Sequence, residues 1–199
     1  MPTQLPSELT IKITLQESEP VIWRRVAVTD DISLERLHDV IQTAMGWFDC
    51  HLHEFHIGDR IYGVPSPDFE DLGHSVLKES GLKLKTLVKR GVKRFEYVYD
   101  FGDYWVHDIE IEGVGSFDAD RNYPCYVDGG NPCPPEDVGG MGGFYHFLEA
   151  IRDPDHEEHD ELIEWADGYD PDTLDVERIR IGLEMIAERS RAPWRRKAG

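Results

Sequence analysis

The chain has 199 residues, which suits a single domain with a sizeable core, because a domain of this size buries roughly 70% of its unfolded surface. Its formal net charge of −19 argues against a protein that binds duplex DNA or an anionic membrane surface, since both kinds of binding need a positively charged protein surface. Three cysteines, no apolar run of ~18 residues and no visible signal peptide predict a soluble, cytoplasmic protein that does not engage a membrane.

Two alternating segments near the N-terminus predict strands. Residues 8–15 alternate apolar and polar side chains, the pattern of a half-buried strand. A second strand is predicted over residues 21–28, where the adjacent Arg24 and Arg25 should point to opposite faces. One arginine is expected in solvent and the other is free to bind a carboxylate or another anion. A surface ion pair is the simpler interpretation.

A helix is predicted to follow Ser33, a good N-cap residue, and to end at Gly46, where a C-terminal cap belongs. Its apolar positions recur at helical spacing: Leu34, Leu37, Ile41, Ala44 and Met45. Residues 50–57 then alternate as a third strand, on which His51 and His53 would share one face.

Residues 97–112 form the segment around which the rest of the prediction is organised. They are predicted to be two strands joined by the tight turn Asp-Phe-Gly-Asp, in which Gly102 accepts positive φ and both Asp side chains can bond local amides. One face of the second strand carries apolar or aromatic residues and a histidine: Trp105, His107, Ile109 and Ile111. That face is expected in the core, which leaves Asp100 and Asp103 near the mouth of the turn.

Three further stretches complete the chain. Residues 83–94 hold six Lys or Arg and no acid, which indicates either a solvated loop and strand edge or an RNA or phosphate patch. Residues 113–143 are rich in Gly and Pro and are predicted to be a long ordered loop. The remainder is predicted to be helical, from the apolar stripes that begin at Phe144, Leu162 and Ile179.

Five segments, in this order, resemble the plasmid pRiA4b ORF-3-like family: Pro20-Val-Ile-Trp-Arg-Arg-Val26, Leu37-His-Asp-Val-Ile-Gln42 with Met45-Gly-Trp47, His51-Leu-His-Glu-Phe55, Tyr97-Val-Tyr-Asp-Phe-Gly-Asp-Tyr-Trp-Val-His107 and Pro132-Cys-Pro-Pro-Glu-Asp-Val-Gly-Gly140. The resemblance implies an α+β fold, with a mainly antiparallel β-sheet packed with helices and a helical C-terminal region. We expect one such domain over residues 1–190 and a basic tail over 191–199. The family is associated with plasmids and other mobile genetic elements and has no established biochemical function.

The candidate binding site gathers residues from the acidic turn and the predicted third strand: His51, His53, Asp100, Asp103, Trp105 and His107. Imidazole and carboxylate together suit zinc or manganese, so the candidate metal ligands are His51, His53, Asp103 and His107. In the alternative interpretation the histidines are packed polar residues and the two Asp side chains bond turn amides.

A second candidate metal site is Cys125 with Cys133, although seven intervening residues are not the spacing of a zinc knuckle. Buried free thiols are the alternative. The resemblance adds that relatives often carry Cys at the position of Val138, so this chain would lack one ligand of a structural zinc site.

Two functions from different classes stay open. The first is a non-enzymatic binding or interaction module for a protein or small-molecule partner, because the sequence shows no complete set of catalytic residues. The second is a metal-dependent hydrolase or nuclease that uses the His and Asp set. Neither a Gly-rich phosphate loop, a nucleophile elbow nor an HExxH motif is present in the sequence.

Overall fold

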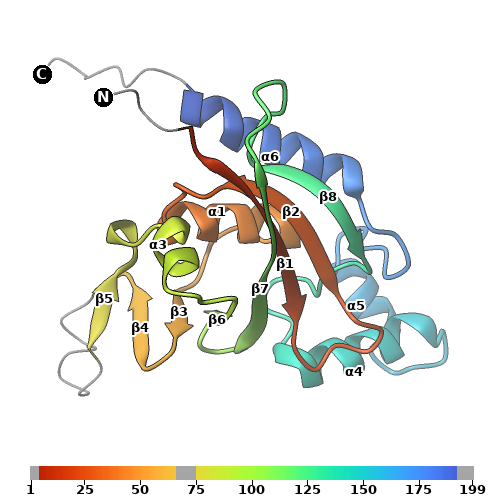
Figure 1. Cartoon of the computed structure of the whole chain (residues 1–199). Coiled ribbons are helices and arrows are strands. Elements are labelled where there is room, and N and C mark those ends of the chain that lie inside the picture. The colour runs from red at the N-terminus through yellow and green to blue at the C-terminus, as the bar shows by residue number, and fades with distance from the viewer. Residues whose placement is uncertain (1–4, 66–74, 192–199) are drawn as a thin grey trace, which may run out of the picture.

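The computed structural model describes residues 5–65 and 75–191, so most of the predicted basic tail lies outside the described residues (Figure 1). Its strands are β1 (Ser7–Leu15), β2 (Trp23–Thr29), β3 (His53–Ile57), β4 (Arg60–Gly63), β5 (Val76–Lys78), β6 (Arg94–Tyr99), β7 (Trp105–Ser116) and β8 (Cys125–Gly130). Its helices are α1 (Leu34–Met45), α3 (Leu84–Lys89), α4 (Gly140–Arg152), α5 (His159–Trp165) and α6 (Val176–Arg191), with a short 3-10 turn η1 (Glu79–Gly81).

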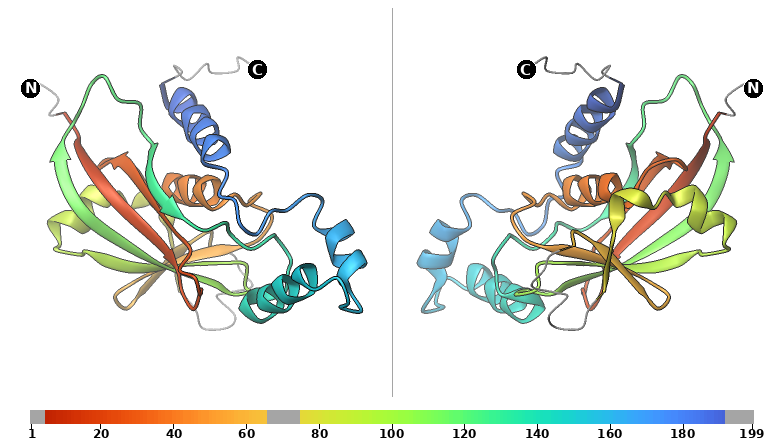
Figure 2. Two further views of the ribbon diagram at one scale, coloured as in Figure 1. Left: turned by 90° about the vertical axis from the view of Figure 1, so that its right-hand side faces the viewer. Right: turned by 90° about the vertical axis from the view of Figure 1, so that its left-hand side faces the viewer.

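The strands form one sheet in the order β5-β4-β3-β6-β7-β1-β2-β8. Every neighbouring pair is antiparallel except β4 with β5, which confirms the predicted α+β fold with a mainly antiparallel sheet. α1 packs on one face of the sheet, and α6 lies against α1 and β8 (Figure 2). No helix of the described segments is both long enough and apolar enough to cross a membrane.

β1 is an interior strand between β7 and β2, and its alternating side chains show which face of the sheet is buried. Leu9, Ile11 and Ile13 are fully buried under the helices, and each contributes about 1.5–3 kcal/mol of hydrophobic stabilisation. The opposite face is polar: Arg25 binds Glu112 at 2.6 Å and lies over the Trp23 ring. The prediction that Arg25 and its neighbour face opposite sides is therefore confirmed.

Arg24 is buried and holds several elements together. Its guanidinium donates to Ala44 O in the last turn of α1 (2.9 Å), to Gly130 O (3.0 Å) and to Asn131 O (2.8 Å). Within residues 5–65 and 75–191 it forms no ion pair, so the partial negative charge at the end of α1 and the loop carbonyls balance it. Arg24 therefore fixes α1 against β2 and the segment after β8.

Three local predictions need correction. The third strand begins at His53 instead of residue 50, because Asp49 takes a left-handed conformation (φ 56°) and residue 51 is a bend. The basic stretch 83–94 contains the short helix α3, whose Leu84 and Leu87 are buried. The predicted loop 113–143 contains the end of β7 and the whole edge strand β8, which pairs with β2.

Candidate functional site

Three loops meet beyond the β6–β7 hairpin: residues 46–52 after α1, the acidic turn 100–104, and residues 131–139 before α4. Four hydrogen bonds join them: Asp100 N to Leu52 O (2.9 Å), Phe48 N to Glu136 Oε1 (2.7 Å), Trp47 Nε1 to Pro134 O (3.0 Å) and Gly139 N to Asp103 Oδ2 (3.1 Å). Each loop includes part of one of the family-like motifs. Segments far apart in sequence thus build one polar site.

The centre of this site is the imidazole of His51. Its Nε2 is buried and is within ion-pair distance of the Asp137 carboxylate, but it makes no hydrogen bond of suitable geometry among the described residues. It lies 3.0 Å from Asp137 Oδ1, 3.6 Å from Asp100 Oδ2 and 3.9 Å from Glu136 Oε2. One nitrogen and two carboxylate oxygens, those of His51, Asp100 and Asp137, lie within 4.8 Å of one another. Ligand atoms bound at ~2.0–2.2 Å around one ion have similar separations.

The two partly buried carboxylates are held by the surrounding backbone. Asp100 Oδ1 accepts a hydrogen bond from Gly102 N (2.9 Å), which leaves Oδ2 directed at His51. Glu136 Oε1 accepts from Phe48 N and from the Tyr99 hydroxyl (3.1 Å), and that hydroxyl also lies 3.3 Å from Oε2, the oxygen on the side of His51. Such outer bonds fix the orientation of metal ligands in known sites.

Left-handed backbone conformations gather at the same place. Asp49, Asp100, Tyr104 and Asp137 all have φ between 55° and 59°. Asp accepts this region more readily than most residues, but a bulky Tyr does so at a conformational cost. With Asn131 (φ 62°), five left-handed non-glycine positions in the three converging loops indicate that the surrounding structure holds these loops in a specific geometry.

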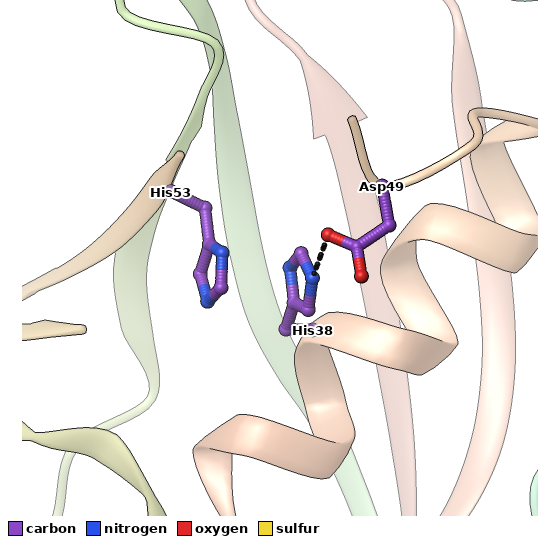
Figure 3. Close-up of side chains that lie close together, drawn as sticks. All are labelled: His38, Asp49 and His53. Carbon is purple, nitrogen blue, oxygen red and sulfur yellow. Dashed lines mark hydrogen bonds and ion pairs between the residues drawn. The ribbon is translucent and has the colours of Figure 1, made fainter. Parts of the chain in front are cut away.

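His53 does not join His51, because it belongs to β3 and points under α1. Its ring stacks on His38, with centroids 3.5 Å apart and an interplanar angle of 8° (Figure 3). His53 Nε2 bonds Glu79 Oε2 at 2.9 Å, and His38 Nε2 bonds Asp49 Oδ1 at 2.8 Å. Each imidazole therefore has its own carboxylate partner.

The stacked pair is a poor metal site although His38, Asp49 and His53 offer ligand atoms within 4.8 Å of one another. Imidazole lone pairs lie in the ring plane, so the lone pairs of two parallel rings do not converge on one ion. Hydrogen bonds already fix His38: its Nε2 donates to the Asp49 carboxylate, which can only accept, so Nδ1 of the neutral ring accepts from the Tyr97 hydroxyl (2.7 Å). His38 is thus neutral with its proton on Nε2, and burial with the neighbouring His53 lowers its pKa.

The other predicted site residues have separate positions. Trp105 and His107 lie in the core on β7, where the Trp105 ring stacks on Trp47 at 5.8 Å. Asp103 accepts a hydrogen bond from Gly139 N and has no contact with His51 among the described residues. The two cysteines are apart and free: Cys125 is on edge strand β8, and Cys133 accepts a hydrogen bond from Arg24 (3.2 Å). The six predicted residues therefore do not converge, and only His51 and Asp100 meet.

Sequence reasoning missed Glu136 and Asp137 as site residues. Both belong to the Pro-Pro-Glu-Asp-Val-Gly-Gly segment that carries the family resemblance, so the signal was present as a motif. Nothing in the spacing of this segment, however, indicates that its side chains lie next to His51 in the folded protein.

His107 should make the protein less stable in mild acid. Burial lowers the pKa of this fully buried imidazole to about 4, against about 6.5 in an unfolded chain, so the unfolded state binds more protons between these values. Stability contributed by neutral His107 is complete above pH 6.5 and falls as the pH drops towards 4. Between pH 7.5 and 5.0, wild type should lose about 2 kcal/mol more unfolding free energy than His107→Leu in urea titrations.

The subtraction between wild type and His107→Leu removes the contribution of His38, which both proteins share. Equal losses in the two proteins would show that His107 is not buried as a neutral group.

Three comparisons show which known proteins this chain resembles in sequence and in fold. The family described as "Plasmid pRiA4b ORF-3-like protein" matches residues 7–178, a range that includes all three loops. The "Uncharacterized protein y4hQ" of Sinorhizobium fredii (strain NBRC 101917 / NGR234) is 39% identical over 199 residues, with 96% of each chain covered. The crystal structure of the protein of unknown function MM3350 from Methanosarcina mazei Go1 has a TM-score of 0.79 and 29% identity, and covers 87% of this chain and 98% of that one.

Proposed function

The chain belongs to the plasmid pRiA4b ORF-3-like family, and we propose that it is a non-enzymatic binding module whose site is built on one divalent metal ion, zinc or manganese. The observation that carries this proposal is the buried His51 Nε2, which lacks a hydrogen bond and faces three carboxylate oxygens at 3.0–3.9 Å. A cation among these groups satisfies the nitrogen and relieves repulsion between the carboxylates.

The donor set favours these metals. His51, Asp100 and Asp137 are the proposed ligands, with Glu136 at the edge of the site. One imidazole with carboxylates suits zinc or manganese better than the soft metals that prefer thiolates. The three cysteines are free and none belongs to this cluster.

A binding role accords with how the nearby carboxylates are used. Asp100 and Asp103 each accept a backbone N–H, and Glu136 accepts both a backbone N–H and the Tyr99 hydroxyl. These bonds hold the loops in place and leave few free groups for proton transfer. The ion is thereby positioned to hold a ligand group of a partner molecule.

A metal-dependent hydrolase is the second candidate, and one observation favours it. The Asp137 side chain is 68% exposed and that of His51 is 29% exposed, so an ion held there is reachable by water and substrate. Three protein ligands plus an open position is the arrangement of catalytic zinc sites, and Glu136 would then act as the general base. Zinc- or manganese-dependent turnover of bis(p-nitrophenyl) phosphate that Glu136→Gln abolishes would favour the hydrolase over the binding module.

Asp100→Asn should weaken metal binding at least tenfold. The amide keeps the size of the side chain and its turn hydrogen bond but removes the charge beside His51. Calorimetric titration of EDTA-treated protein with zinc chloride, and separately with manganese chloride, measures the affinity. Asp128→Asn is the matched control, because Asp128 is an exposed carboxylate on β8 that accepts a hydrogen bond from Gly129 N (2.9 Å) and lies 3.6 Å from Arg25, away from His51.

The proposal predicts one ion per chain in wild type and in Asp128→Asn. Wild type without a binding heat for either metal, or equal affinities in wild type and Asp100→Asn, would refute the site.

A further inference from the structure

A cleft separates the body of the protein from the segment that leads from α5 into α6. One wall is made by residues 46–48 and 132–137, and the other by residues 165–179. Two adjoining cavities of about 560 and 590 Å³ make up the cleft, and they share Gly46, Pro135, Gly168, Tyr169 and Arg178. The cleft is therefore one elongated depression.

Aromatic rings line one end of the cleft. Phe48 is 67% exposed and Trp165 is 45% exposed, and both line the cavity that also contains Trp47 and Tyr169. The Tyr169 hydroxyl is buried without a hydrogen-bond partner among the described residues. Two exposed large rings facing one cavity, with an unsatisfied hydroxyl beside them, are typical of a surface that another molecule covers.

The charge of the cleft is strongly negative. Its lining includes six carboxylates: Glu136, Asp137, Asp167, Asp170, Asp175 and Glu177. Among the described residues, the cations that line these cavities are Arg24 and Arg178, and Arg24 donates to buried carbonyls. The unbalanced acids lie along both cavities, so a ligand with several positive charges in a row would be complementary to them.

Arg178 already shows the kind of contact that this cleft makes. Its guanidinium lies over the Phe48 ring, 5.8 Å from the ring centroid. Arginine over an aromatic face is a favourable cation–π interaction. A second cationic side chain would find the Trp165 ring and the Asp167 carboxylate in the same cavity.

We propose that this cleft binds an extended, basic segment of a partner polypeptide, with Lys or Arg side chains against Phe48, Trp165 and the acids of residues 167–177. A nucleic acid would be repelled by the six carboxylates, and an apolar ligand would leave them unpaired. The inference stands apart from the metal site, although Glu136 and Asp137 line both.

The test is the binding of a fluorescently labelled peptide of alternating Gly and Arg, measured by anisotropy at 150 mM salt in the presence of EDTA. Phe48→Ala and Trp165→Ala change no charge, so they separate a built cleft from attraction to a chain of net charge −19. We expect each variant to bind at least tenfold more weakly than wild type. Tyr104→Ala is the control, since Tyr104 is a 59% exposed aromatic residue that does not line the cleft.

Because EDTA is present throughout the titration, failure of the metal site would leave this result unchanged. Absence of peptide binding by wild type, or equal binding by wild type, Phe48→Ala and Trp165→Ala, would overturn the proposal. Spermine can also be added as a competitor of the labelled peptide. An inhibition constant for spermine equal to the dissociation constant of the peptide would overturn the proposal, because the ligand would then be a small polyamine.

Discussion

Gly143→Ala should lower the free energy of unfolding by about 3 kcal/mol, whereas Gly142→Ala should leave it unchanged or raise it. Both residues lie in the first turn of α4, after the loop that supplies Glu136 and Asp137. A Cβ at position 143 would lie 1.9 Å from Val138 O, a backbone atom that cannot move without the loop. A Cβ at position 142 meets nothing within 4 Å, and alanine is the better helix former.

Urea unfolding of wild type and the two variants measures this difference. Because the two substitutions are chemically identical and adjacent, the comparison isolates the packing of the loop against α4. Equal stabilities of the two variants would show that Val138 and Gly143 are not in close contact.

Trp105→Ala should cost about 3–5 kcal/mol of unfolding free energy. The side chain is 1% exposed, and its ring lies between β7 and the segment after α1, stacked on Trp47. Its removal leaves a large cavity directly beneath the three loops of the site. Trp165→Ala is the control, because that ring is 45% exposed and should cost much less.

Thermal and urea unfolding of both tryptophan variants check this expectation. A Trp105→Ala protein as stable as wild type would place the ring at the surface and make it a binding residue. The sequence left both roles open, since Trp105 was included in the candidate site and also in the predicted core face.

Much of the fold was predictable because its central strands alternate regularly. β1, β6 and β7 carry apolar residues at every second position. α1 begins after the N-cap residue Ser33 and ends at the C-cap residue Gly46, and both residue types are recognisable helix caps in the sequence. β8 was not predictable in the same way. Only Tyr126 and Val127 favour a strand in its Cys-Tyr-Val-Asp-Gly-Gly sequence, and the Asp-Gly-Gly end is a strand because it pairs with the edge of β2.

The candidate site was predictable only in part, for a physical reason at each residue. His51 and His53 share a face only if both are in a strand, and Asp49 with φ 56° turns the chain before β3 begins. Glu136 and Asp137 reach His51 because their loop bonds a distant one, through Trp47 Nε1 to Pro134 O and Phe48 N to Glu136 Oε1, and no local pattern encodes this pairing. The acidic turn itself was recognised, because Gly102 and the Asp side chains give it a local signature.

Metal content measured by elemental analysis tests the proposed site most directly. Purified, untagged wild type and His51→Asn are incubated with excess zinc or manganese, desalted and analysed side by side. The proposed site predicts close to one equivalent of metal in wild type and little in His51→Asn, because the variant lacks the imidazole that faces Asp100, Glu136 and Asp137. No metal in wild type, or the same content in both proteins, would contradict it.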